Sequence, residues 1–467
     1  MFNGESEDKA DDFNSFDEEF RFCLEKIESG YYFDIIEKIE DLIEESIELG
    51  KYEEGIILAD ELLKLYPYDS EIWSQKGVLY LNVFKFSKAL ECFEKALSFN
   101  PNDDETLIQK SNLEIYTLKL DDAEETLLKA LNINPLNSEI YFNLGVIYQK
   151  KQLYKKAINN YQLCLALDSE FSDAYFEMGL CYESIKNLEN ALKAYEDFTN
   201  LEPYNILGWY NKGVILVRMD KIEEGLKCFD LVTSIEDDFV SAWFNKGNAY
   251  AELGKIDDAI YCFKKVIKID PNDEIAYYNL GNLYEEKGDL IKAIYYYTKA
   301  IKVGDDYYEA YLARGYCYNT LGKTKLALKD FNKAISISID DAEAWNAKAN
   351  LMYEMGKIQK SIRLYKIALK FEPENVDLLL NLAEAQYEAN SWLEALETYD
   401  KLISLNPDNS EFYYQKAKIN FILNRTNDAI ASLKKAFELN PEMRKEFEEE
   451  YPEIHFSKLF KKLLGDN

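Results

Sequence analysis

Asparagine residues that follow two aromatic residues recur along the chain and offer its clearest binding chemistry. The pattern reads YFN at 141–143, WYN at 209–211, WFN at 243–245 and YYN at 277–279. An asparagine amide can donate a hydrogen bond to one peptide group and accept a hydrogen bond from another. A row of such amides would bind the backbone of an extended chain without regard to the side chains of that chain.

Other kinds of chemistry find little support in the sequence. The stretch GKT at 322–324 lacks the earlier glycine that a phosphate-binding loop requires, because Cys317 stands at that place. His455 is the single histidine, so we expect no metal site built from several histidines. The seven cysteines contain no Cys-x-x-Cys pair, and we interpret them as small buried hydrophobic residues. We therefore expect no catalytic residue, no metal and no cofactor, so that the protein is not an enzyme.

Charge and hydropathy narrow the class of partner. The chain has 467 residues, of which 54 are basic and 86 acidic, for a net charge of −32. Such a chain is unsuited to nucleic acid or to an acidic membrane surface, and it should attract basic partners. The N-terminal residues carry no apolar signal segment, and the sequence has no apolar run of about 18 residues that would cross a membrane. We expect a cytoplasmic protein.

The amides recur because the whole sequence follows a single repeat period. Eight prolines lie at marks separated by multiples of 34: Pro67, Pro101, Pro135, Pro203, Pro271, Pro373, Pro407 and Pro441. If this mark is position 32 of each unit, residues 36–443 divide into twelve units with no insertion or deletion. Internal repeats with a fixed period in this range are typical of solenoids and propellers.

The pattern within a unit predicts two helices, which we call A and B. Apolar residues at positions 4, 7, 8 and 11 form the stripe of helix A, and those at positions 20, 24 and 27 form the stripe of helix B. Small residues at positions 8 and 20 let the two helices approach closely, and rings at positions 4, 11 and 24 fill the space between them. Position 15 is glycine or asparagine in seven units, which predicts a left-handed turn. Aspartate or asparagine at position 34 predicts the cap of the next helix A.

This pattern resembles the tetratricopeptide repeat family, whose period and signature it shares over residues 36–443. The resemblance implies an all-α fold, an α-solenoid of about twelve helix-turn-helix repeats that forms a right-handed superhelix with the A helices on its concave face. Position 7 departs from the family pattern, because it is lysine or arginine in seven units where the family prefers leucine. The repeats are predicted at 36–69, 70–103, 104–137, 138–171, 172–205, 206–239, 240–273, 274–307, 308–341, 342–375, 376–409 and 410–443.

The flanks of the repeats are predicted to close the array. We expect residues 1–13 to be a disordered acidic segment and residues 14–35 to form an N-terminal capping helix. Residues 444–467 are expected to form C-terminal capping helices. The basic amphipathic stretch at 456–464 within them is also compatible with a helix that binds a membrane surface or a partner, or that folds back on the last repeat.

A helical wheel places the asparagines away from the apolar stripe. Position 6 lies about 200° from position 4, and positions 2, 9 and 13 cluster with it, so these positions face the predicted groove. Position 5 lies on the flank of the groove and is often aromatic. The predicted peptide-binding residues are Asn143, Asn211, Asn245, Asn248, Asn279, Asn282, Asn381, Phe142, Tyr210, Phe244 and Tyr278.

The groove residues also indicate what kind of ligand to expect. Position 2 is acidic in nine units, and positions 2, 5 and 6 carry no lysine or arginine in any unit. Recognition of a carboxylate or an acidic tail is therefore disfavoured, and we predict an extended protein or peptide segment that is neutral or basic. Two alternatives stay open: a solvated polar face that needs no ligand, and a structural solenoid that self-associates.

Overall fold

Paired α-helices that recur with the period of the sequence make up the fold of this protein. The computed structural model describes residues 5–30 and 33–450, and within these ranges all regular structure is helical. Helix A of the successive pairs begins at Ile36, Ser70, Asp104, Ser138, Ser172, Ile206, Val240, Glu274, Tyr308, Ala342, Val376 and Ser410.

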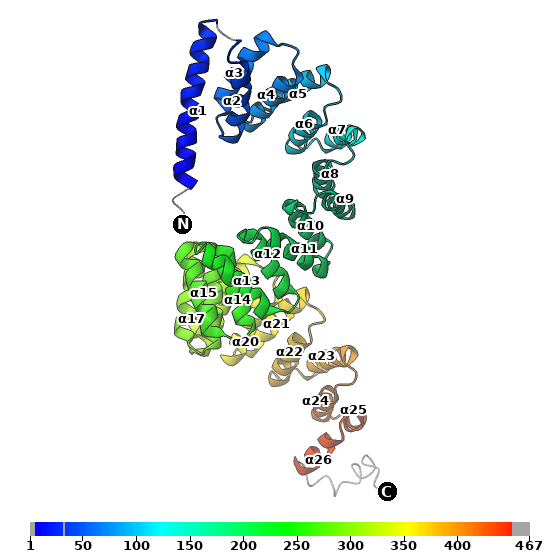
Figure 1. Cartoon of the computed structure of the whole chain (residues 1–467). Helices are drawn as coiled ribbons and strands as arrows, with labels where there is room; N and C mark the ends of the chain where they lie inside the picture. The colour runs from blue at the N-terminus through cyan, green and yellow to red at the C-terminus, as the bar shows by residue number, and fades with distance from the viewer. Residues whose placement is uncertain (1–4, 31–32, 451–467) are drawn as a thin grey trace. The chain divides into compact units, whose positions relative to one another are not determined.

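The helices have the following bounds: α1 Glu5–Glu28, α2 Ile36–Glu48, α3 Tyr52–Leu65, α4 Ser70–Asn82, α5 Phe86–Phe99, α6 Asp104–Tyr116, α7 Leu120–Ile133, α8 Ser138–Lys150, α9 Tyr154–Leu167, α10 Ser172–Ser184, α11 Leu188–Leu201, α12 Ile206–Arg218, α13 Ile222–Ile235, α14 Val240–Glu252, α15 Ile256–Ile269, α16 Glu274–Glu286, α17 Leu290–Val303, α18 Tyr308–Thr320, α19 Thr324–Ile337, α20 Ala342–Glu354, α21 Ile358–Phe371, α22 Val376–Glu388, α23 Trp392–Leu405, α24 Ser410–Ile422, α25 Thr426–Leu439 and α26 Pro441–Glu450. Figure 1 labels most of them.

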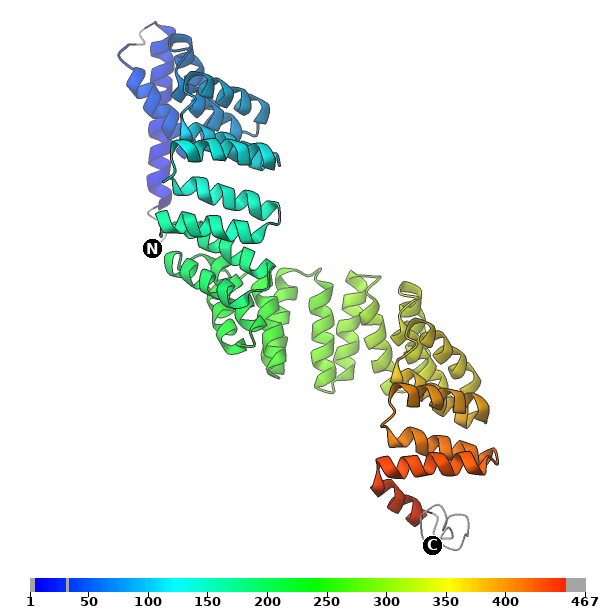
Figure 2. The ribbon, with the colours of Figure 1, turned by 90° about the vertical axis from the view of Figure 1, so that its right-hand side faces the viewer.

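The chain forms two compact units, Met1–Asp237 and Asp238–Asn467. Within each unit the two helices of a pair pack against each other, and each pair then packs on the next pair along the chain. The pairs coloured cyan to green, which belong to the first unit, lie one after another in Figure 2. Both units therefore have the all-α solenoid architecture that the period predicts.

The predicted helix caps and turns are present. The side chains of Asp69, Asp103, Asn137, Asp273 and Asp341 all accept hydrogen bonds from backbone N–H groups in the first turn of the next A helix. Position 15 has a positive φ, between 55° and 75°, in all twelve repeats. Five of these residues are neither glycine nor asparagine, namely Phe84, Leu118, Gln152, Lys186 and Asp220. The repeat therefore imposes a left-handed backbone conformation at position 15 even where the residue has a side chain that disfavours it.

Close contact between helices A and B depends on glycine at position 8 and a ring at position 24. A Cβ atom added to Gly281 would lie 2.3 Å from the ring of Tyr297, and one added to Gly145 would lie 2.4 Å from the ring of Tyr161. Both rings are fully buried. The predicted reason for a small residue at position 8 is therefore confirmed.

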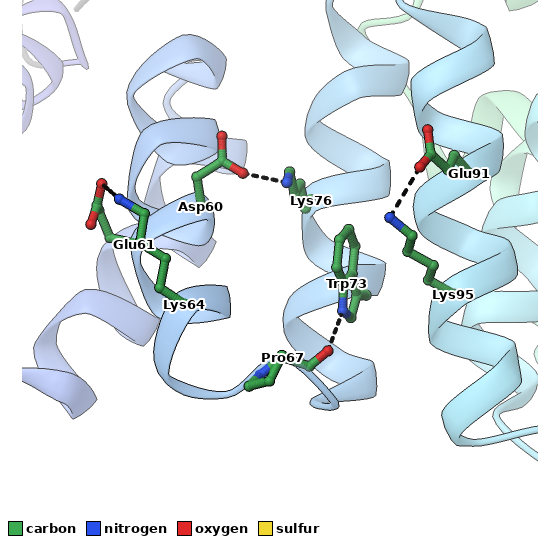
Figure 3. A network of polar contacts seen from close by, with 8 residues as sticks. All are labelled: Asp60, Glu61, Lys64, Pro67, Trp73, Lys76, Glu91 and Lys95. Atoms are coloured by element: carbon green, nitrogen blue, oxygen red, sulfur yellow. Dashed lines mark hydrogen bonds and ion pairs between the residues drawn. The ribbon is translucent and has the colours of Figure 1, made fainter.

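The residues at positions 4 and 7 link neighbouring repeats, as the contacts around Trp73 and Lys76 show (Figure 3). The indole N–H of Trp73 donates to the carbonyl of Pro67, 3.0 Å away, and the corresponding bond joins Trp209 to Pro203 at 2.9 Å. Lys76 lies over the Trp73 ring and pairs with Asp60 of the preceding helix B. Three of the lysines that depart from the family pattern at position 7, Lys76, Lys212 and Lys416, therefore link adjacent repeats.

Both ends of the array differ from the prediction. Helix α1 begins at Glu5, so residues 5–13 are helical rather than disordered, and α1 ends at Glu28 rather than continuing to residue 35. The side chains of Phe16 and Cys23 in this helix are buried against the first repeat. At the other end α26 begins at Pro441, and its Met443 and Phe447 are buried against the last repeat. The stretch 456–464 lies outside the described residues.

Candidate functional site

The A helices of adjacent repeats contact each other through polar side chains. Within the first unit the amide of Asn143 donates to the Asn112 side chain, with 2.9 Å between Nδ2 and Oδ1. Within the second unit the amide of Asn381 donates to Asn346 over 3.3 Å. These residues occupy positions 5, 6 and 9, and positions 12 and 13 make similar contacts between repeats, as Asn319 does with Glu354. We call the surface formed by positions 2, 5, 6, 9, 12 and 13 of the A helices the A-helix face.

The predicted asparagines all lie on this face, but their surroundings differ. Asn143 is buried, Asn248 is exposed, and the others are half-buried, namely Asn211, Asn245, Asn279, Asn282 and Asn381. The Asn282 side chain accepts a hydrogen bond from the Tyr297 hydroxyl, with 2.8 Å between the oxygen atoms. The amides at positions 6 and 9 thus also serve the packing of the repeats, a role that the sequence pattern did not reveal.

The predicted aromatic residues at position 5 are half-buried and contact the ring at position 24 of their own repeat. Ring centroids lie 5.7 Å apart for Phe142 and Tyr161, and 5.5 Å apart for Phe244 and Phe263. Tyr210 meets Phe229 and Tyr278 meets Tyr297 at similar distances. These rings therefore stabilise the contact between helices A and B, which the sequence analysis had assigned to positions 4, 11 and 24.

Two glutamates on the A-helix face lie near other carboxylates that oppose their ionisation. Burial and the nearby Glu105 carboxylate raise the pKa of Glu139, although a hydrogen bond from Asn112 acts in the opposite direction. Burial, Asp341 and Glu372 likewise raise the pKa of Glu343. Both glutamates stand at position 2. A cation placed beside them would lower the cost of keeping these groups ionised.

The cysteines are unsuited to nucleophilic chemistry. All seven are buried, and burial raises the pKa of Cys164, of Cys181 and of Cys317 to about 12. A thiol with so high a pKa stays protonated near neutral pH and is inert.

Among the described residues no group of His, Cys, Asp and Glu side chains is arranged to hold a metal ion. In the same part of the chain, none of the helices is long and apolar enough to cross a bilayer.

One cavity opens on the A-helix face, between α22 and α24, and the sequence analysis did not predict it. Its volume is about 290 Å³. We call it the α22–α24 cavity, and its polar and aromatic lining includes Tyr353, Glu384, Tyr387, Glu388, Tyr399 and Glu411. A cavity of this size suits a single side chain, because clefts for whole small molecules start near 300 Å³ and extend to about 1,000 Å³.

The sequence alone does not single out this cavity. Tyr399 stands at position 24, where tyrosine hydroxyls elsewhere donate to an amide or carboxylate at position 9 or 12 of the same repeat. In this repeat position 12 is Tyr387, whose ring packs on Trp392 with centroids 4.9 Å apart. The repeat of Tyr365 also has a tyrosine at position 12, and position 9 of the Tyr399 repeat is the acceptor Glu384, so residue types do not reveal the missing hydrogen bond.

Family models for the tetratricopeptide repeat match along most of the array. Their residues are 70–103, 126–159, 172–205, 272–338, 352–419 and 410–443, and a further model described as TPR repeat matches 247–288. The chain belongs to the tetratricopeptide repeat (TPR) family. It is therefore a multi-repeat scaffold of the kind that mediates protein–protein contacts, in a family that is typically non-enzymatic.

Solved TPR structures are similar to this chain at low identity. The TPR protein YrrB, described as having an unusual peptide-binding site, is 26% identical over 40% of this chain and 96% of its own, with a TM-score of 0.37. MamA from Desulfovibrio magneticus RS-1 is 20% identical over 36% and 94%, with a TM-score of 0.34. A chain of the Cut9–Hcn1 complex is 13% identical over 91% and 94%, with a TM-score of 0.38. No curated protein matches the sequence.

Proposed function

We propose that this TPR scaffold binds an extended protein segment, neutral or basic, along its A-helix face. The observation that carries the proposal is the excess of carboxylates on a face whose positions 2, 5 and 6 contain no lysine or arginine in any repeat. Repulsion between these carboxylates falls when a basic segment lies beside them, which favours such a partner over an acidic one.

The asparagines are proposed to direct the backbone of the bound segment. Neighbouring helices lie about 8–10 Å apart and an extended chain rises about 3.3 Å per residue, so one amide would meet the ligand at about every third residue. Asn211, Asn245 and Asn279 occupy the same position in three successive repeats. An amide has two donors and an acceptor with two lone pairs, so a side chain that bonds within the protein retains capacity for a ligand.

The test begins with a displayed library of random linear peptides selected against the whole protein. Peptides that bind should be neutral or basic, and affinity for the basic ones, measured by fluorescence anisotropy, should fall as the salt concentration rises. The triple variant Asn211→Ala, Asn245→Ala and Asn279→Ala should bind these peptides at least tenfold more weakly, because each lost hydrogen bond contributes about 1 kcal/mol.

A matched triple variant on the B helices separates binding from stability. Asn159, Asn190 and Asn332 are exposed asparagines of α9, α11 and α19, and their replacement by alanine should leave peptide affinity unchanged. Equal loss in both triple variants would refute the amide row. Failure to select any peptide, together with self-association in light scattering, would refute the proposal and favour the self-assembling solenoid.

A further inference from the structure

One tyrosine at position 24 in the second unit has a hydroxyl group without the hydrogen-bond partner that its counterparts have. Four tyrosines at position 24 donate from their hydroxyl groups within their own repeat: Tyr161 to Gln149, Tyr195 to Glu183, Tyr297 to Asn282 and Glu285, and Tyr365 to Asn350. Tyr399 is the fifth. It is only 4% exposed and lines the α22–α24 cavity, and among the described residues its hydroxyl finds no hydrogen-bond partner. Among the described residues the one side-chain atom that is both buried and without a hydrogen-bond partner is the Tyr308 hydroxyl, so the Tyr399 hydroxyl is open to the cavity and can donate to or accept from a ligand there.

The carboxylates around the same cavity also lack a cation. Glu384, Glu388 and Glu411 line it, and no ion pair joins any of them to a basic group in the part of the chain that the structure describes. Glu411 accepts instead from the amide of Gln415, and Glu388 hydrogen-bonds to the hydroxyl of Tyr353. Neither bond neutralises the negative charge of its carboxylate. The cavity therefore combines uncompensated acid with a free hydroxyl group.

The remaining walls of the cavity are aromatic. Tyr353 and Tyr387 lie on successive A helices, α20 and α22, and both line it. Aromatic faces attract organic cations, and a planar guanidinium group also stacks on them. A small metal ion would gain nothing from rings, and an ammonium group has three donors where a guanidinium has five in one plane. The lining favours a guanidinium group over both.

We propose that the α22–α24 cavity binds an arginine side chain of the bound segment. The guanidinium group donates to Glu384 and to the Tyr399 hydroxyl, stacks on the tyrosine walls, and neutralises the surrounding carboxylates. This assignment rests on the proposed function and adds to it. It names one residue type that the bound segment must contain, and the repeat that binds this residue.

The direct experiment uses a probe too small to occupy the rest of the face. The protein is labelled with 3-fluorotyrosine, and the fluorine NMR signal of residue 399 is identified by its loss in Tyr399→Phe. N-acetyl-arginine methylamide should shift that signal in a saturable manner, and the neutral citrulline analogue should not. Glu384→Gln should weaken the response about tenfold, since a hydrogen bond to a charged group is worth about 1.5–3 kcal/mol.

Two control variants keep the result specific. Glu309→Gln removes one carboxylate at position 2 of α18, outside the cavity, and should leave the response unchanged. Tyr365→Phe removes a hydroxyl that already bonds to Asn350, and should lower the melting temperature. Tyr399→Phe should leave the melting temperature unchanged or raise it, because no hydrogen bond is lost.

The outcomes distinguish the cavity from the rest of the proposed function. No shift with the arginine probe, or an equal shift with the lysine analogue, would overturn the arginine assignment even if library peptides bind elsewhere on the face. A saturable arginine-specific shift would support the assignment even if the library yields no peptide, in which case the proposed function alone would fail. If arginine-containing peptides are selected, their affinity should also fall about tenfold in Tyr399→Phe.

Discussion

Within the described part of the chain, Lys348 lacks the ion pair that links some adjacent repeats, and Asn332→Asp should supply it. Three position 7 lysines pair with an acid at position 25 of the preceding helix B: Lys76 with Asp60, Lys212 with Glu196 and Lys416 with Asp400. In the helix B that precedes Lys348, position 25 is Asn332. Burial lowers the pKa of Lys348, with no acidic group acting in the opposite direction. Lys348 is therefore partly buried like the paired lysines at position 7, but it lacks an acidic partner that would offset the cost of burying its charge.

The gain expected from Asn332→Asp follows from the exposure of the existing pairs, which include Lys76 with Asp60. The acids of the three pairs are 49%, 48% and 56% exposed, whereas the lysines are 10%, 18% and 28% exposed. Because one partner of each pair stays in contact with solvent, the pair is worth no more than about 0.5–1 kcal/mol. The variant should be more stable by that amount where both groups are charged. The gain should vanish in acid as the carboxylate protonates, and in base as Lys348 loses its proton.

The assay is urea unfolding in a double-mutant cycle with Lys348→Met. Asn332→Asp should stabilise the parent protein and leave the Lys348→Met background unchanged or less stable, which gives a coupling energy of about 0.5–1 kcal/mol. Asp400→Asn provides the reverse control, because it removes an existing pair and should lower stability by a similar amount. A coupling energy of zero, or a gain that persists without the lysine, would refute the reasoning.

Two further predictions concern backbone positions that the repeat constrains. Gly281→Ala should lower the free energy of unfolding by about 1–3 kcal/mol, because its new methyl group would strike the buried ring of Tyr297, whereas Gly288→Ala should cost only about 1 kcal/mol through its φ of +75° in open space. Equal losses in urea unfolding would mean that the ring moves aside freely. Leu118→Gly should stabilise the protein by about 1 kcal/mol, because Leu118 is 71% exposed and has a φ of 60°. A loss of stability would instead reveal packing by its side chain.

Local rules of sequence account for most of the fold. The period, the helix caps at position 34 and the close contact of Gly281 with Tyr297 all follow from residue types at fixed spacing. The start of α1 at Glu5 was missed because an acidic segment has little apolar periodicity before Phe16. The positive φ of Phe84 was missed for another reason, since only the helices on either side of the turn impose it.

The candidate site was harder to predict because it depends on which polar side chains hydrogen-bond to one another and which rings pack together. The wheel placed Phe142 and Asn143 in or beside the predicted groove, but the structure uses both within the scaffold, through the Tyr161 ring and the Asn112 amide. A wheel gives the direction of a side chain from one helix axis. It does not give the reach of a ring or amide toward a neighbouring helix, which depends on packing in three dimensions.

The repeats of this chain provide their own reference for separating scaffold from site. Each polar position is sampled in up to twelve similar surroundings, so an interaction found in most of them belongs to the repeat and needs no ligand to explain it. By this criterion the hydrogen bonds of Tyr161 and Tyr365 are structural, since similar bonds recur at position 24. Tyr399 has similar burial without the bond, although Glu384 stands as an acceptor at position 9 of its repeat. This departure is not explained by the repeat, and because the Tyr399 hydroxyl opens into the cavity, it is the group of this repeat that a ligand there would engage.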